Sequence, residues 1–240
     1  MKKYHKINTI WKRDSSTPRD VIIPGDWAIP EFEYLADNEW EFTEKLDGTN
    51  IRLIWFGGVN IMGKTDDATI PDALMDVLDK QKLSKLFDKA FNSRAYRDPA
   101  SPFRHLENLP RVCLYGEGVG ARVHRGAGKY GDPKVVLFDV AVCDAQNHDH
   151  WWWLDRENVK DVAKNMGFEH SPLIGRGTLH DMVEMVKSGL SSSWGDFQAE
   201  GIVARPSVQM WNRRGERIIA KLKTSDYHDL KLHLNHEHLI

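Results

Sequence analysis

Short strand-like segments separated by glycine turns are the feature that most limits the folds open to this 240-residue chain. Residues 51–56 and 59–64 flank Gly57-Gly58, a pattern typical of a β-hairpin because glycine adopts the positive φ of primed turns. Alternating or continuous apolar character predicts further strands at 112–115, 135–142, 201–204 and 217–223.

Helical patterns interrupt these strands. Apolar residues at helical spacing follow Pro71, and their period slips near Lys80, so we expect two short helices or one kinked helix there. Cap and stop residues predict two more helices, between Asp155 and Gly167 and between Thr178 and Gly189. The sequence therefore predicts an α+β fold with mainly antiparallel sheets flanked by helices.

Composition excludes several classes of protein. No apolar run approaches the roughly 20 residues of a membrane span, and the basic N-terminus is not followed by the apolar stretch of a signal peptide. The formal net charge of −2 argues against a polybasic coat for nucleic acid. Cys113 and Cys143 lie in apolar runs, which indicates reduced thiols and a cytoplasmic protein without a membrane segment.

The segment Glu-Lys-Leu-Asp-Gly-Thr-Asn at 44–50 has the most distinctive local chemistry. Lys45 is expected at the end of a strand, with Asp47 on the same side, before the turn that Gly48 permits. Such a lysine is a nucleophile if neighbouring cations and partial burial lower its pKa. The alternative is a solvated lysine before an ordinary Asp-Gly turn.

Four charged residues further along the chain are embedded in apolar strand-like segments. A lone buried charge is costly, so each must be paired or functional. Lys221 and Lys223 project from one face of one strand, and Glu117 and Glu200 are carboxylates suited to a hard divalent ion. With Lys45 they provide what phosphoryl transfer needs: a nucleophile, phosphate-neutralising cations and metal ligands.

In this order, the motifs resemble those of the covalent nucleotidyltransferase superfamily of polynucleotide ligases and mRNA capping enzymes. The set is most similar to the ATP-dependent RNA ligase 2 group. The matching segments are Lys45 within 45–50, Gly63-Lys64-Thr65, Tyr115-Gly116-Glu117, Phe138-Asp139, Glu200-Gly201 and Lys221-Leu222-Lys223. The resemblance implies an ATP-grasp-like adenylation domain and a reaction in three steps. Lys45 would become lysyl-AMP, the AMP would pass to a 5′-phosphate, and a 3′-hydroxyl would displace it.

The resemblance also implies roles for single residues. Glu44 would contact adenine largely through its main chain, and Phe138 would stack on it unless it is simply a core residue. Glu117 would hold the ribose and, with Glu200, serve Mg²⁺ or Mn²⁺, whereas the alternative for both acids is a structural ion pair. The remaining ATP-binding residues implied near the phosphates are Asn50, Lys64, Lys221 and Lys223.

Two residues bear on the substrate. Asn50 replaces the arginine usual in DNA ligases and capping enzymes, which favours RNA ends. Asp47 replaces the histidine often found in the RNA ligase 2 group and resembles the DNA ligase pattern. We expect RNA with a 5′-phosphate and a 3′-hydroxyl, either as free ends or in a nicked duplex. The alternatives are a small DNA nick ligase and an end-binding module that seals poorly.

Only residues 224–240 follow Lys223, so we expect one nucleotidyltransferase domain over 1–240 without a C-terminal OB-fold or helical domain. The catalytic domain would then either bind the nucleic-acid ends itself or be completed by a partner protein or a homodimer. The basic stretch that contains Arg122, Arg125 and Lys129 is a candidate nucleic-acid contact, although an ordinary exposed loop would have the same composition.

Two aromatic or histidine-rich segments admit ordinary interpretations. The tryptophans at 151–153 are expected to pack at the start of a helix, with base stacking as the alternative. The histidines at 228, 233, 236 and 238 are irregularly spaced, so they predict a solvated helical tail rather than a metal site.

Overall fold

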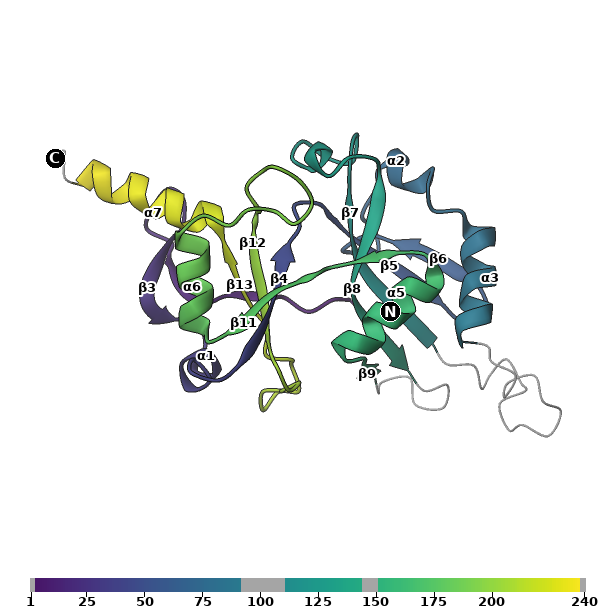
Figure 1. Ribbon diagram of the computed structural model, residues 1–240, viewed down its shortest axis with the longest axis horizontal. Coiled ribbons are helices and arrows are strands. Elements are labelled where there is room, and N and C mark those ends of the chain that lie inside the picture. The colour runs from purple at the N-terminus through teal and green to yellow at the C-terminus, as the bar shows by residue number, and fades with distance from the viewer. Residues whose placement is uncertain (1–2, 92–110, 144–150, 238–240) are drawn as a thin grey trace. The chain divides into compact units, whose positions relative to one another are not determined.

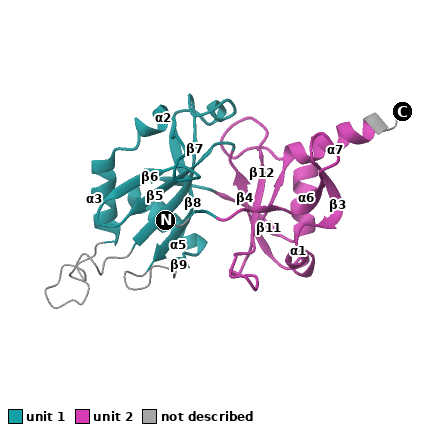
Figure 2. Cartoon of the chain, turned by 180° about the vertical axis from the view of Figure 1, so that it is seen from behind, with its two compact units in different colours: residues 1–4, 47–171 teal, residues 5–46, 172–240 magenta. Residues whose placement is uncertain are grey.

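The computed structural model describes residues 3–91, 111–143 and 151–237. The chain forms two compact units (Figure 2): unit 1 contains residues 1–4 and 47–171, and unit 2 contains residues 5–46 and 172–240. Each unit has a mainly antiparallel sheet with helices beside it (Figure 1). The predicted α+β class with mainly antiparallel sheets is therefore confirmed.

Unit 2 is built on a five-stranded sheet in the order β1-β13-β12-β4-β11, in which only the β1–β13 pair is parallel. Its strands are β1 (Asn8–Thr9), β4 (Trp40–Lys45), β11 (Leu173–Gly177), β12 (Gly201–Pro206) and β13 (Ala220–Lys223). A two-stranded ribbon consists of β2 (Trp11–Asp14) and β3 (Val21–Trp27). The helices are α1 (Pro30–Tyr34), α6 (Leu179–Lys187) and α7 (Thr224–Glu237).

The alternation of side chains along β4 positions the predicted nucleophile. Trp40, Phe42 and Glu44 are buried, and the residues between them, ending with Lys45, face the other side of the sheet. Phe42 packs in a core with side chains of α6. Helix α6 begins at the expected capping box, in which Thr178 and Asp181 bond reciprocally.

Unit 1 contains a sheet in the order β10-β8-β7-β5-β6, and β9 also pairs with β8. Its strands are β5 (Thr49–Trp55), β6 (Val59–Met62), β7 (Arg111–Val119), β8 (Lys134–Cys143), β9 (Trp151–Trp153) and β10 (Glu169–His170). Its helices are α2 (Asp72–Met75), α3 (Lys80–Phe91), the 3₁₀ turn η2 (Ala127–Tyr130) and α5 (Arg156–Met166).

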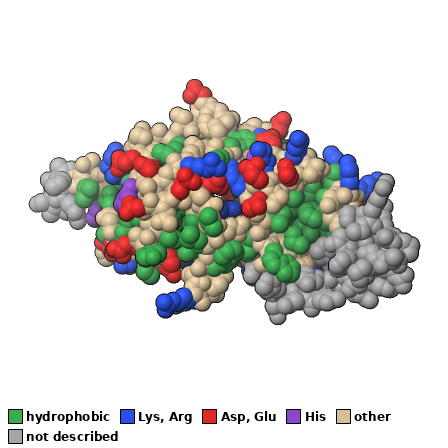
Figure 3. Space-filling view, turned by 60° about the horizontal axis from the view of Figure 1, so that its bottom comes forward, with side chains coloured by type: hydrophobic (Ala, Val, Ile, Leu, Met, Phe, Trp, Pro, Cys, Tyr) green, Lys and Arg blue, Asp and Glu red, His purple; other side chains and the backbone are tan. Residues whose placement is uncertain are grey.

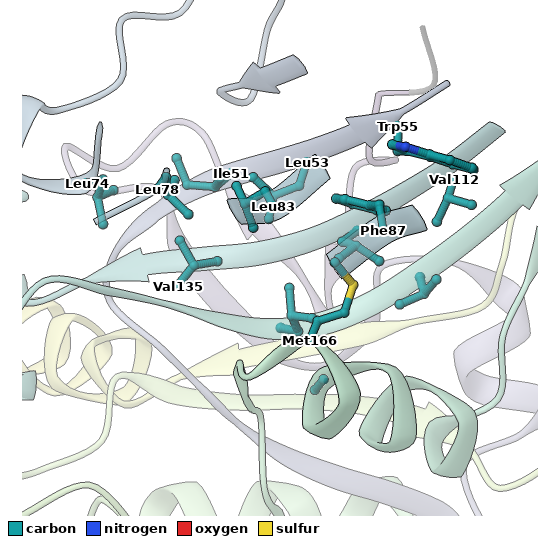
Figure 4. Close-up of a cluster of buried hydrophobic side chains, with 14 of the residues drawn as sticks. Ile51, Leu53, Trp55, Leu74, Leu78, Leu83, Phe87, Val112, Val135 and Met166 are labelled. Carbon is teal, nitrogen blue, oxygen red and sulfur yellow. The ribbon is translucent and has the colours of Figure 1, made fainter. Parts of the chain in front are cut away.

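The predicted hairpin is present in unit 1. Strands β5 and β6 pair antiparallel, and Gly57 in the turn has a φ of +66°. β5 is buried on both faces: one face joins side chains of α3 and α5 in a core (Figure 4), and Ile54 on the other face packs with Tyr115. Ile51, Leu53 and Phe87 are among the fully buried members. The slip near Lys80 corresponds to two helices, α2 and α3, as one of the two interpretations predicted.

The tryptophans at 151–153 do not begin a helix, and that prediction was wrong. They form strand β9, which pairs with β8, because consecutive bulky aromatic residues fit a pleated surface well. Trp152 keeps 48% of its surface exposed, while Trp153 packs against the sheet. Helix α5 starts only at Arg156, after Asp155 caps it.

The strand expected at 217–223 is shorter than predicted. Arg217 makes an isolated bridge to Trp211, and continuous pairing begins at Ala220. The histidine-containing tail is helical up to Glu237, as expected.

None of the helices in the described ranges is long and apolar enough to cross a membrane. On the face drawn in Figure 3, lysine and arginine side chains are interspersed with aspartate and glutamate. This mixture agrees with the formal net charge of −2.

Candidate active site

The predicted site residues are divided between the two units. Unit 2 contains Glu44, Lys45, Glu200, Lys221 and Lys223. Unit 1 contains Asn50, Lys64, Glu117, Phe138, Arg122, Arg125 and Lys129.

Three adjacent strands bring the charged residues of unit 2 together. Strand β12 lies between β4 and β13, and its residue Gly201 is the register partner of both Lys45 and Lys223. A Cβ atom on Gly201 would collide with the carbonyl oxygen of Leu222. Glycine is therefore required after Glu200, because the backbone of β13 passes too close for any side chain.

Glu200 forms ion pairs with two of these lysines. The Nζ atom of Lys45 donates to Oε2 of Glu200 at 2.6 Å, and Nζ of Lys223 lies 2.9 Å from Oε1. The side chains of Lys45 and Glu200 are 22% and 14% exposed. Lys45 also donates to the carbonyl oxygen of Leu46 at 3.4 Å. The nucleophile predicted from the sequence is thus held in a defined position, but it remains accessible.

Lys221 is the third cation on this face of the sheet. Its pKa is lowered, first by burial and then by the positive charges of Lys45 and Lys223. Placing three ammonium groups so close is electrostatically unfavourable without anions. This arrangement favours binding of a polyanion such as a phosphate chain.

Glu44 has its side chain on the opposite face of β4, where it is buried. Its carboxylate accepts hydrogen bonds from Ser192 Oγ at 2.6 Å, Ser193 N at 2.7 Å and Ser193 Oγ at 2.6 Å. These bonds fix the loop at 191–198 to the strand that carries Lys45. The Glu44 carboxylate is therefore hydrogen-bonded to this loop. The expected main-chain contact between Glu44 and adenine remains a prediction.

In unit 1, Asn50 on β5 and Glu117 on β7 are register partners. The Oδ1 atom of Asn50 is buried and has no hydrogen-bond partner in the described part of the chain. Beside them, a Cβ atom on Gly48 would collide with the carbonyl oxygen of Gly118. Glycine at 48 therefore allows the segment after Lys45 to pass directly over β7.

A β-bulge displaces Phe138 from the regular pattern of β8. Tyr115 pairs with Asp139 and Gly116 pairs with Leu137, so Phe138 is the extra residue between them. Bulges redirect side chains and are common beside active sites. Phe138 is only partly buried, and the ring of Tyr4 contacts it.

Lys64 is exposed in the loop after β6. Arg52 holds this loop, because its Nε donates to the carbonyl oxygen of Gly63 at 2.7 Å and its NH2 group to Asp66 Oδ1 at 2.8 Å. Arg52 is fully buried. The bond from Arg52 is the main reason that the pKa of the Asp66 carboxyl is lowered.

The basic stretch between β7 and β8 is attached to Asp47. The backbone N–H of Asp47 donates to the Tyr130 hydroxyl at 3.1 Å, and His124 Nε2 lies 3.0 Å from the Asp47 carbonyl oxygen. The Nζ atom of Lys129 is 3.9 Å from the Asp47 carboxylate. The side chains of Arg122 and Arg125 are exposed.

A sequence model of the RNA ligase family matches residues 38–223. The chain belongs to the RNA ligase family. The matched range contains every residue that the sequence predicted for the site. It ends at Lys223, the last residue of β13.

Solved structures of a Naegleria gruberi RNA ligase are similar to this RNA ligase family member in fold. A ligase variant with ATP and Mn has a TM-score of 0.53 and 14% identity, with 92% of this chain and 59% of that chain covered. The same ligase with PPi has a TM-score of 0.52 and 16% identity over 92% and 57% of the two chains. An apo variant has a TM-score of 0.52 and 15% identity over 92% and 56%. This RNA ligase family member thus spans less than two thirds of the ligase it matches.

Sequence reasoning missed four side chains that support the predicted residues: Tyr4, Arg52, Ser192 and Ser193. A charged residue inside the apolar run of β5 was a usable signal for Arg52. Ser192 and Ser193 carried no signal, because their importance comes from bonds to Glu44, about 150 positions away in sequence.

Proposed function

We propose that this protein is an ATP-dependent RNA ligase that carries AMP covalently on Lys45. The observation that carries the proposal is the cluster in unit 2. An accessible lysine ends β4, one carboxylate holds it, and two further lysines lie on the same sheet. Membership of the RNA ligase family supports ligase chemistry in general.

In the first step, the lone pair of Lys45 Nζ attacks the α-phosphorus of ATP. A P–N bond forms, the bond to pyrophosphate breaks, and the amine proton leaves to solvent. Only a deprotonated amine is nucleophilic, whereas Nζ donates to Glu200 at 2.6 Å. In this proposal Nζ therefore loses its ammonium proton before it attacks.

Lys221 and Lys223 neutralise charge on the phosphates in this proposal. Both extend from β13, and the lowered pKa of Lys221 reflects partial burial among cations that a bound anion would relieve. Phe138 stacks on adenine, Glu117 contacts the ribose, and Asn50 and Lys64 lie near the phosphates.

Glu200 is suited to serve a divalent ion. No group of three or more His, Cys, Asp or Glu side chains in the described ranges is arranged to hold a metal. Mg²⁺ usually takes one or two carboxylates, with substrate phosphates and water completing its shell, so the single carboxylate of Glu200 fits this mode. Bound Mg²⁺ or Mn²⁺ would neutralise the phosphate charge that grows during transfer.

In the later steps the P–N bond to Lys45 breaks as AMP passes to a 5′-phosphate, and a 3′-hydroxyl then bonds to that phosphate and displaces AMP, which is released as the strand is sealed. We propose RNA as the substrate and the exposed Arg122, Arg125 and Lys129 as phosphate contacts. Asp47 favours one second candidate, a DNA nick ligase, because it departs from the histidine of the RNA ligase 2 group.

The test is incubation with α-labelled ATP and Mg²⁺, followed by nicked duplexes with RNA or DNA on each side of the nick. One AMP should attach to Lys45, and Lys45→Ala should abolish labelling. Lys160→Ala is the matched control, because Lys160 lies exposed on α5 and pairs only weakly with Glu157. Labelling that survives in Lys45→Ala would contradict the proposal, and sealing of DNA alone would favour the second candidate.

A further inference from the structure

Tyr4, close to the start of the described residues, contacts the strand that carries Phe138. The hydroxyl of Tyr4 donates to Oδ2 of Asp139 at 2.7 Å. Asp139 is fully buried and directly follows Phe138 in β8. A buried carboxyl group that lacks hydrogen-bond partners is costly, so the bond from Tyr4, with that from the Val140 N–H, stabilises Asp139 next to the bulge.

The ring of Tyr4 packs among three other aromatic rings. Its centroid lies 5.0 Å from Tyr115, 5.1 Å from Phe138 and 5.6 Å from Trp153. These distances are within the range of favourable aromatic pairs. All four residues pack in one cluster on the sheet of unit 1, together with the buried side chain of Ile54.

The rings of Tyr4 and Phe138 are nearly perpendicular. Their planes meet at 83°. The two rings therefore contact each other edge to face, one of the favoured geometries of an aromatic pair, and are not stacked in parallel.

We propose that Tyr4 is a positioning residue that fixes the Phe138 ring for stacking on the adenine of ATP. The inference rests on the proposed function, because it needs ATP as the ligand. Tyr4 acts in two ways: its ring limits the rotation of Phe138, and its hydroxyl holds Asp139 at the bulge that directs Phe138.

The experiment measures lysyl-AMP formation against ATP concentration for Tyr4→Ala, Tyr4→Leu and Tyr4→Phe. Tyr4→Ala and Tyr4→Leu should each raise the KM for ATP by about tenfold and leave kcat within about twofold, because no group that touches the phosphates changes. Tyr4→Phe keeps the ring and should restore most of the affinity. Tyr34→Ala is the matched control, since Tyr34 is 87% exposed on α1.

A double-mutant cycle with Phe138→Leu separates positioning from general packing. If Tyr4 acts through Phe138, Tyr4→Leu should not raise KM further once Phe138 is replaced. Equal effects of Tyr4→Leu with and without Phe138 would overturn the proposal. So would a KM for Tyr4→Leu that is unchanged, or lower than that of the wild type.

Failure of the proposed function would look different. In that case the wild-type protein itself would form no lysyl-AMP, whatever residue stands at position 4. Thermal unfolding followed by circular dichroism establishes that each variant is folded. If Tyr4→Ala does not fold, Tyr4→Leu and Tyr4→Phe still give the comparison, because both fill the space among the aromatic rings.

Discussion

Replacement of Glu200 by glutamine tests both the stability and the chemistry of the site, because the Glu200 carboxylate contacts both Lys45 and Lys223. The change removes the negative charge and keeps the size of the side chain. It leaves the ammonium groups of Lys45 and Lys223, on the two strands that flank β12, without the anion between them. We expect lower stability and loss of lysyl-AMP formation from the same substitution.

The expected loss of stability follows from how exposed the Lys45–Glu200 and Lys223–Glu200 ion pairs are. Hydrogen bonds to charged groups contribute about 1.5–3 kcal/mol, whereas exposed ion pairs contribute about 0–1 kcal/mol. The Lys45–Glu200 pair, at 22% and 14% exposure, lies between these limits, and Lys223 is 37% exposed and more strongly screened. The two pairs together give about 2 kcal/mol, which lowers Tm by about 4–8 °C in a chain of this size.

The assay is thermal unfolding by circular dichroism in about 0.05 M and 0.5 M NaCl, since salt screens charge interactions. Glu184→Gln is the control, because Glu184 pairs with Lys187 on the surface of α6. It should change Tm little, and the deficit of Glu200→Gln should shrink in high salt. The reasoning is refuted if Glu200→Gln unfolds at the same temperature as the control variant. A variant that still forms lysyl-AMP would refute the assigned role of Glu200.

Three further predictions concern the surrounding structure. Arg52→Met should cost about 2 kcal/mol for the bond to the Gly63 carbonyl. The same substitution should remove the stabilisation that comes from the lowered pKa of Asp66. In the wild type this stabilisation is present above the unfolded pKa of Asp66 and is lost as pH falls through the lowered folded pKa. Measuring Tm of both proteins at decreasing pH checks this. Lys221→Met should raise Tm near pH 7. The pKa of Lys221 is lowered, so the folded state binds its proton less tightly than the unfolded state does. The increase in Tm should shrink as pH rises towards 10.5. Gly48→Ala should cost about 2–3 kcal/mol in urea unfolding, because its Cβ meets the backbone of β7, while Gly58→Ala, with open space around it, should change little.

The sequence predicted best those elements whose own residues carry the signal. The hairpin at Gly57-Gly58 and strand β8 follow from local apolar patterns and turn chemistry. Strand β3 was missed because Pro24 and Gly25 interrupt it, and both residues argue against a strand. Strands β1 and β10 have two residues each and exist only through pairing with distant partners.

In the candidate site too, the residues with a local sequence signal were predicted, and the contacts that depend on distant residues were not. Lys45 was identifiable from the segment at 44–50 that contains it, and Glu200 because a charge beside an apolar strand-like segment needs an explanation. That the two form an ion pair could not be read from the sequence, since it depends on the register between β4 and β12. The position of Tyr4 was equally hidden, because 135 residues separate it from Asp139.

The burial of both cysteines has a practical consequence for spectroscopy. Cys113 and Cys143 are the two cysteines of the chain; both are buried, and burial raises the pKa of the Cys113 thiol to about 12. Thiol reagents attack thiolates, so the native protein should resist maleimide dyes and spin labels. A cysteine introduced at an exposed position in each unit would then take a label selectively. Distances between such labels would measure the separation of the two units with and without nucleotide.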